Sequence, residues 1–288
     1  MFRQLVKTVF GGFSALSLSA CSPVTVLNAM VPESGYQHQA DIQYGDLPRH
    51  KLDVYQPVTS TGSKKPATVI FFYGGGWEAG EKADYKFVAE ALTSQGIMVV
   101  IPDYRVYPEV VFPQFIEDAA QSVAWTKQHI AEYGGDPEQL FIAGHSAGAH
   151  IAAMVTINPV YLQQVEMQPQ QLRGMIGLAG PYDFLPLKSD TLKQIFGDES
   201  SQWQSQPVNY VTTDHPPMLL LVGNDDRTVL PRNSLRLADR LKQHGNSVKL
   251  VEFNGYGHVA MVAKLAKPLR GNGALLTSIV SFIEQHSD

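Results

Sequence analysis

A serine flanked by glycines is the first pattern in this sequence that could carry out chemistry. Gly144-His145-Ser146-Ala147-Gly148 follows the apolar segment 140–143 and precedes the helix-forming segment 147–157. Glycines on both sides of a serine permit the tight strand-to-helix turn that lifts a hydroxyl to the edge of a sheet. The pattern predicts Ser146 as a nucleophile, and the N-terminus of the following helix favours negative charge developing beside it.

A serine hydroxyl is a weak nucleophile unless a base and an orienting acid accompany it. His258 ends the sequence Asn254-Gly255-Tyr256-Gly257-His258, which follows the apolar segment 249–253. Asp225 and Asp226 follow the apolar segment 218–222. Because the carboxyl ends of parallel strands meet at one sheet edge, we expect His258 and one of the two aspartates to lie beside Ser146.

Three consecutive glycines, Gly74-Gly75-Gly76, end another apolar segment, 68–73. Gly74-x-Gly76-x-x-Ala79 formally matches a dinucleotide-binding fingerprint, and Asp103 lies where a ribose-binding acid belongs. However, Trp77, Glu78 and Gly80 intervene before convincing helix begins near Asp84, whereas the fingerprint requires a helix that starts inside the turn. A phosphate loop fits less well, because Gly75-x-x-x-x-Gly80 continues as Glu81-Lys82. We therefore expect no nucleotide cofactor.

The elements that would position these residues alternate between strand and helix. The apolar segments predict strands at 41–44, 51–55, 68–73, 97–101, 140–143, 175–178, 218–222 and 249–253. Helical periodicity predicts helices at 85–95, 115–133, 147–157, 233–243 and 274–286. This order predicts an α/β fold with a mostly parallel sheet of about eight strands and helices on both faces.

Two parts of this arrangement carry further expectations. The segment 51–55 alternates apolar and polar residues, which predicts a half-solvated strand in an edge hairpin. The segment Gly180–Pro217 interrupts the strand–helix rhythm and contains Tyr182, Phe184, Phe196 and Trp203. We interpret it as a short insertion over the carboxyl edge of the sheet, where such folds bind ligands.

The N-terminus has the features of a targeting segment. Arg3 and Lys7 precede a mostly apolar stretch that ends in Leu18-Ser19-Ala20-Cys21, and Cys21 is the only cysteine. The pattern resembles a bacterial lipoprotein signal, although an ordinary secretory signal with an accidental cysteine is the alternative. We expect a signal peptide at 1–20, lipidation at Cys21, a lipidated tether at 21–38 and one domain at 39–288. Ser22 after the cysteine, in place of aspartate, resembles lipoproteins sent to the outer membrane of the bacterial cell envelope, so we expect that location rather than the inner membrane.

Composition excludes several classes of protein. The chain has 288 residues and a formal net charge of −5 without a lysine or arginine cluster, so we expect no nucleic-acid partner. A lone cysteine excludes an intramolecular disulfide. No spacing of histidine, cysteine and acidic residues predicts a metal site, and we expect no cofactor. The oligomeric state is left open.

Taken together, these motifs resemble α/β-hydrolase-fold esterases of the bacterial carboxylesterase, hormone-sensitive-lipase-like group. Five segments carry the resemblance: Tyr73-Gly74-Gly75-Gly76-Trp77, Asp103-Tyr104-Arg105, the sequence 144–150, Gly223-x-x-Asp226-x-x-Val229 and Gly257-His258. The resemblance implies a Ser146–Asp226–His258 triad and selects Asp226 over Asp225. It adds Gly75 and Gly76 to Ala147 as backbone donors of an oxyanion hole. Tyr73 departs from the pattern, since the group usually has histidine there.

The resemblance implies a hydrolase that cleaves a small-molecule carboxylic ester through an acyl-enzyme and meets the membrane through its lipid anchor. Arylformamidase or other amidase or peptidase activity on the same triad is the alternative, and a noncatalytic envelope binding protein is a third. We expect Trp77, Tyr182 and Phe184 to line the substrate pocket. We also expect His145 and His150 to be structural, and Asp103 to pair with Arg105 beneath the glycine loop.

Overall fold

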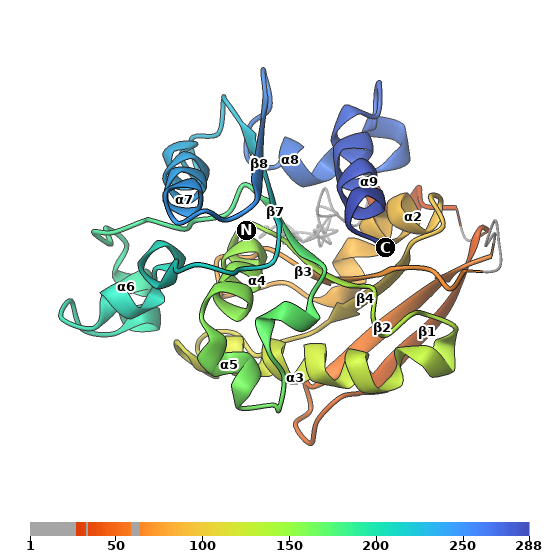
Figure 1. Ribbon diagram of the computed structural model, residues 1–288, viewed down its shortest axis with the longest axis horizontal. Coiled ribbons are helices and arrows are strands. Elements are labelled where there is room, and N and C mark those ends of the chain that lie inside the picture. Colours follow the sequence, from red (N-terminus) through yellow and green to blue (C-terminus); the bar gives the residue numbers. More distant parts are fainter. Residues whose placement is uncertain (1–26, 33, 59–63, 288) are drawn as a thin grey trace, which may run out of the picture.

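Eight strands form one sheet in the computed structural model, which describes residues 27–32, 34–58 and 64–287 (Figure 1). The strand order is β1-β2-β4-β3-β5-β6-β7-β8; β1 pairs antiparallel with β2 and β2 with β4, while the other neighbours are parallel. This arrangement confirms the predicted α/β fold. The strands are β1 (Tyr36–Gln43), β2 (Lys51–Pro57), β3 (Thr68–Phe72), β4 (Met98–Pro102), β5 (Leu140–His145), β6 (Gly174–Leu178), β7 (Met218–Gly223) and β8 (Val248–Phe253).

Helices cover both faces of the sheet (Figure 1). On one face lie α2 (Lys86–Thr93), α8 (Ala260–Ala263) and α9 (Ala274–His286). The opposite face carries α3 (Gln114–His129), α4 (Ala147–Ile157), α5 (Pro159–Gln163) and α7 (Arg232–Gln243). None of the helices in the described ranges is long and apolar enough to cross a membrane.

Strands β3 to β7 are buried along their whole length, which explains why they read as near-continuous apolar runs. Their register brings the predicted active-site segments together. Phe72 at the end of β3 pairs with Gly144 of β5, so the glycine loop emerges beside the serine turn. The amide of Ser146 then donates to the carbonyl of Leu178 at the end of β6 (2.9 Å), which fixes the turn against the next strand.

The N-terminal boundary of the domain differs from the prediction. The sheet begins at Tyr36, inside the segment 21–38 that we expected to be a tether. Tyr36 is buried, and the ring of His38 stacks on Tyr55 (4.2 Å between centroids). Earlier still, the side chain of Asn28 donates to the carbonyl of Ala83 (2.7 Å). The sequence did not indicate the start of this strand, because most of β1 is polar and exposed. Cys21 and the predicted signal peptide lie outside the described residues.

The expectation that strand β2 is half solvated is wrong. Its alternating polar residue, Asp53, is only 2% exposed, and apart from Lys51 and Gln56 every residue of β2 is buried, so both faces of the strand are covered. A buried carboxylate needs partners, and Asp53 finds them in Lys82 and His38. The alternation therefore marks a buried ion pair and not a solvent-facing surface.

Candidate active site

The serine turn is built by close packing between β5 and α4. Ser146 has the strained backbone angles φ 55° and ψ −123°, which place it at the sharp transition from strand to helix. A Cβ at Gly144 would lie 2.3 Å from the carbonyl oxygen of Gly148, and one at Gly148 would lie 2.0 Å from the carbonyl oxygen of Phe72. Both glycines are therefore required for α4 to pack against the strands.

Ser146, His258 and Asp226 come together at the carboxyl edge of the sheet. The hydroxyl of Ser146 is 2.8 Å from Nε2 of His258, and Nδ1 of His258 is 2.7 Å from Oδ2 of Asp226. The other oxygen of Asp226 accepts backbone N–H bonds from Thr228 and Val229 (2.9 Å each). The side chain of Asp226 is fully buried, whereas the neighbouring Asp225 is exposed and does not approach His258.

These contacts define the proton positions of the histidine. A carboxylate only accepts hydrogen bonds, so the Nδ1–H of His258 donates to Asp226. Nε2 is then left with a lone pair that accepts the hydroxyl proton of Ser146. The arrangement can transfer that proton to His258 while Asp226 stabilises the resulting positive charge.

The acid and base loops are locked to each other. The amide of Asp225 donates to the carbonyl of Tyr256 (3.1 Å), and the side chain of Asn224 donates to that of Asn254 (2.7 Å). A Cβ at Gly223 would lie 2.1 Å from the carbonyl oxygen of Tyr256, so only glycine permits this approach. The separation of Asp226 from His258 is therefore set by backbone contacts between the loops.

The glycine loop turns directly beside the serine. A Cβ at Gly74 would lie 3.1 Å from Cβ of Ser146. Gly75, Gly76 and Trp77 all have positive φ values (143°, 65° and 62°), which gives the backbone a course that glycine adopts readily. Ala147 is the first residue of α4, a position whose N–H has no partner within a helix. The three residues predicted as oxyanion donors thus belong to two segments that adjoin Ser146.

Tyr73 braces the glycine loop from behind. Its hydroxyl donates to Oδ1 of Asp103 (2.9 Å) and accepts from Nη2 of Arg49 (2.9 Å), which also bonds the carbonyl of Gly80. The backbone amide of Lys82 donates to the same Asp103 oxygen (2.7 Å). One carboxylate oxygen thus ties residues 73 and 82 together and closes the loop between them. Burial raises the pKa of both Asp103 and Tyr73.

The predicted pairing of Asp103 with Arg105 is wrong. Arg105 instead forms a bidentate ion pair with Asp118 of α3, with Nη2–Oδ1 and Nε–Oδ2 distances of 2.6 and 2.9 Å. Asp103 does lie beneath the glycine loop, but its partners come from the loop itself and from Arg49. Proximity in the sequence suggested the pair, but each side chain finds a partner from a distant element: Arg105 in Asp118, and Asp103 in Tyr73.

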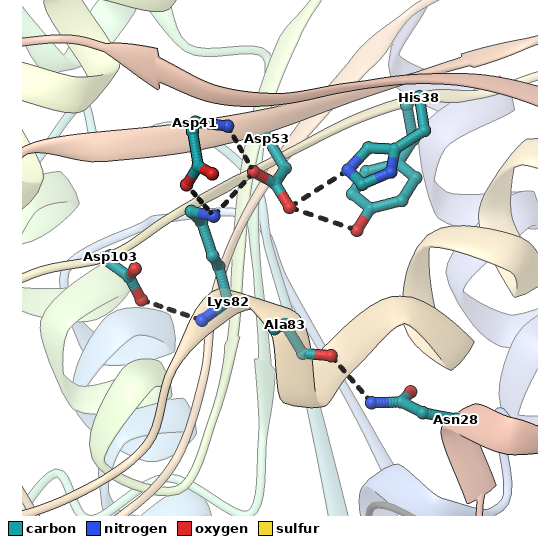
Figure 2. Close-up of polar contacts among 8 residues, drawn as sticks. Asn28, His38, Asp41, Asp53, Lys82, Ala83 and Asp103 are labelled. Carbon is teal, nitrogen blue, oxygen red and sulfur yellow. Dashed lines mark hydrogen bonds and ion pairs between the residues drawn. The ribbon is translucent and has the colours of Figure 1, made fainter.

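A second ion-pair cluster joins the β1–β2 hairpin to the end of the glycine loop (Figure 2). The ammonium of Lys82 lies 2.8 Å from both Asp41 and Asp53. Asp53 also accepts from the amide of Asp41 and contacts His38 (3.0 Å each). Burial alone would raise the pKa of Asp53, but the hydrogen bonds from His38 and Lys82 lower it. The carboxylate therefore stays ionised in its buried position.

Aromatic side chains from the insertion pack against Trp77 of the glycine loop. Trp77 is 5% exposed, stacks on Phe184 (5.8 Å between centroids) and meets Phe196 edge-on (4.8 Å). Its indole N–H donates to Nδ1 of His150 (3.2 Å), whose Nε2–H donates to the carbonyl of Ser205 (2.7 Å). Burial lowers the pKa of His150 to about 4. His150 is thus a packed, neutral, hydrogen-bonded residue, as predicted.

Tyr182 does not line this space. It is fully buried, and its hydroxyl occupies the room left by two glycines: a Cβ would lie 1.9 Å from it at Gly177 and 2.4 Å at Gly180. Its assignment to the substrate pocket is therefore wrong, because its ring points into the sheet. Phe196, which we did not single out for the pocket, takes the corresponding place beside Trp77.

Other supporting residues had weak signals or none in the sequence. Arg49 and Lys82 stand in no recognisable motif, and their roles depend on contacts across the fold. The amides of Thr228 and Val229 bond Asp226 through a local turn that the Gly-x-x-Asp spacing could have indicated. Within residues 27–32, 34–58 and 64–287, no group of three histidine, cysteine or acidic side chains could hold a metal ion.

Comparisons with known proteins extend this description. The BD-FAE family model matches residues 52–241. The chain is 32% identical over 252 residues to a probable isoprenylcysteine alpha-carbonyl methylesterase of Arabidopsis thaliana, covering 80% of this chain and 52% of that protein. It is 34% identical over 231 residues to kynurenine formamidase of Danio rerio, covering 78% and 76% respectively. The chain therefore spans about half the length of the Arabidopsis methylesterase.

A solved esterase structure superimposes on most of the chain. The propionate-bound esterase 2 of Thermogutta terrifontis superimposes with a TM-score of 0.71 and 25% identity, covering 88% of this chain and 96% of that one. The shared region extends well beyond the residues around Ser146.

Proposed function

Because the chain belongs to the BD-FAE family and has the α/β-hydrolase fold of esterases, we propose that it is a serine hydrolase that cleaves carboxylic esters. The observation that carries this proposal is the continuous hydrogen-bond chain from Ser146 through His258 to Asp226. Both hydrogen bonds fall within about 2.6–3.2 Å, the range in which a base can activate a serine.

The reaction follows from this geometry. His258 removes the hydroxyl proton of Ser146 as the oxygen attacks the ester carbonyl, and it then donates that proton to the departing alcohol. Asp226 keeps the imidazole in the required tautomer and stabilises its charged form. Water, deprotonated by His258, next attacks the acyl-enzyme and releases the carboxylic acid and free Ser146.

Backbone amides would stabilise the tetrahedral oxyanion. The proposed donors are the N–H groups of Gly75 and Gly76, which follow Gly74 beside Ser146, and that of Ala147 at the start of α4. The amide of Ala147 also lies at a helix N-terminus, where negative charge is favoured. Loss of one such donor typically costs about 3–4 kcal/mol of transition-state stabilisation.

Turnover of a small substrate panel tests the proposal. The purified protein should hydrolyse p-nitrophenyl acetate, and Ser146→Ala should retain only the background rate. A wild type that hydrolyses neither p-nitrophenyl acetate nor p-nitrophenyl decanoate would exclude the esterase function. Full activity in Ser146→Ala would instead exclude the nucleophile assignment.

Amide hydrolysis is the second candidate. The similarity to kynurenine formamidase, of which the chain covers 76%, favours it specifically. The same triad and oxyanion donors would serve a formamide, since both reactions pass through a tetrahedral oxyanion. Turnover of N-formylkynurenine with a higher kcat/KM than that of p-nitrophenyl acetate would favour this reading.

The acyl group is proposed to be short. Trp77, Phe196 and His150 are 5%, 3% and 0% exposed, so the side of the site that they form is already filled by rings. The T. terrifontis esterase was solved with propionate. We expect kcat/KM to fall along the series p-nitrophenyl acetate, propionate and decanoate, and a preference for decanoate would contradict the proposal.

Two finer assignments remain proposals on sequence grounds. Within the fold, the glycine loop and the sequence 144–150 favour the hormone-sensitive-lipase-like group. The sequence Leu18-Ser19-Ala20-Cys21 favours lipidation at Cys21 and attachment to the outer membrane of a bacterial cell envelope. Labelled palmitate should enter the wild-type protein and not Cys21→Ala. Equal labelling of the two proteins would contradict the anchor.

A further inference from the structure

His145 lies at the junction of three segments that build the active site. It immediately precedes Ser146, and its Nε2 is 3.1 Å from the backbone carbonyl oxygen of His258. Its Nδ1 would lie 3.0 Å from a Cβ placed on Gly74 in the glycine loop. The residue is 5% exposed, and its ring centroid is 4.9 Å from that of His258. One buried side chain thus touches the nucleophile, base and glycine segments.

The contacts fix the protonation of His145. A carbonyl oxygen only accepts hydrogen bonds, so Nε2 carries the proton and donates to His258. Nδ1 then holds a lone pair, and it has no hydrogen-bond partner among the described residues. Burial, followed by the proximity of His258, lowers the pKa of His145 to about 3. The ring is therefore neutral at the pH values where an esterase would work.

His258 needs such a contact because its other bonds belong to the reaction. Its two ring nitrogens bond Ser146 and Asp226, and the first of these bonds must break in each catalytic cycle. The following residue, Val259, is 69% exposed, so little packing restrains the loop from outside. Among the described residues, the carbonyl of His258 otherwise accepts only a longer bond from the amide of Met261 (3.3 Å).

We propose that His145 is a positioning residue that holds the backbone of His258 through its Nε2–H, so that the imidazole stays between Asp226 and Ser146. This inference rests on the proposed esterase function. It assigns a mechanical role to the position between the first glycine and the serine, which the pattern G-x-S-x-G leaves free.

Three substitutions test the role. His145→Leu removes the donor at similar volume, and His145→Gln keeps an N–H at about the same distance from the backbone. His129→Gln, on the partly exposed surface of α3, is the matched control. We expect His145→Leu to lower kcat for p-nitrophenyl acetate about five- to tenfold, the effect of one hydrogen bond, with KM nearly unchanged. His145→Gln should recover most of the rate, and the control should match the wild type.

A spectroscopic measurement separates this role from general packing and from the esterase proposal. The downfield proton resonance of the His258 Nδ1–H reports its bond to Asp226 without any substrate. It should broaden or shift in His145→Leu and persist in His145→Gln. Unchanged kcat and resonance in His145→Leu would overturn the inference. Equal losses in both variants with a lowered Tm would also overturn it, since packing would then explain them. An inactive wild type would remove the esterase function, while the resonance would still show whether His145 positions His258.

Discussion

At the scale of single residues, two adjacent aspartates have opposite environments. Asp226 is buried and saturated by His258 and two backbone amides, whereas Asp225 faces solvent. The orienting acid needs both features, because the backbone bonds fix its position and burial strengthens its interaction with the imidazolium. The neighbours therefore provide a matched pair for experiment.

Asp226→Asn should lower kcat for p-nitrophenyl acetate by about 10³–10⁴-fold, because an amide in this position favours the wrong histidine tautomer. Asp225→Asn should change it less than about twofold, as expected of an exposed side chain. Steady-state kinetics on both variants provide the measurement. A larger loss in Asp225→Asn would reverse the assignment.

Tyr73, which departs from the histidine that the resemblance led us to expect, supports the glycine loop through its hydroxyl. Tyr73→Phe should destabilise the protein by about 1–3 kcal/mol, since the half-buried side chains of Arg49 and Asp103 each lose a partner. The glycine loop should also become less well fixed once the hydroxyl is lost, so that kcat falls several-fold while KM changes little. Urea unfolding and kinetics measure these effects, with Tyr133→Phe in the short 3₁₀ helix Ile130–Tyr133 that follows α3 as the control. Wild-type values in both measurements would show that the hydroxyl does not hold the loop.

At the scale of secondary-structure elements, the site depends on how closely α4 approaches β3. Gly148→Ala would place a methyl group 2.0 Å from the carbonyl oxygen of Phe72, so the helix must move. We expect a destabilisation of about 1–3 kcal/mol from overpacking and a large loss of activity as Ser146 shifts. Gly257→Ala is the stability control, since its methyl group would meet only the carbonyl oxygen of Asp225 at 3.7 Å. Thermal unfolding of the two variants measures the effect, and equal Tm values would contradict the close packing of α4 against β3.

The sequence predicted elements well where local patterns decide them. Helices α4 and α9 begin and end where we expected, because apolar periodicity and flanking glycines mark them. The prediction from sequence failed where the ion-pair partner of a residue lies far away in the sequence. Asp53 looked solvent-facing because nothing nearby reveals Lys82, and Arg105 looked like the partner of Asp103 because Asp118 belongs to another element. Tyr182 was misplaced because an aromatic residue in an insertion does not show which way its ring points.

At the scale of the whole molecule, the Lys82 cluster makes stability depend on pH in a predictable direction. The folded pKa of Asp53 is lowered, so its contribution is present above its unfolded pKa of about 4 and is lost as the pH falls below it. The folded pKa of Lys82 is raised, so its contribution is lost only in strongly alkaline solution. Between these limits the β1–β2 hairpin remains tied to the glycine loop.

Lys82→Met should therefore cost about 3 kcal/mol at pH 7, because it leaves the buried Asp53 without its cation. The difference in unfolding free energy between Lys82→Met and the wild type should shrink as the pH falls below about 4, where Asp53 becomes protonated. Urea denaturation of both proteins at a series of pH values measures it. A difference that grows toward acid pH would contradict the ion-pair explanation.

We propose that the fold brings Asp226 and His258 to Ser146 from distant parts of the chain and so makes the hydroxyl of Ser146 a nucleophile. The most direct test is peptide mass spectrometry after exposure to a fluorophosphonate, which reacts covalently with activated serines. We expect one adduct, on Ser146, which forms rapidly in the wild type, is absent from Ser146→Ala and forms far more slowly in His258→Ala. No adduct in the wild type, or an adduct on another residue that persists in Ser146→Ala, would contradict it.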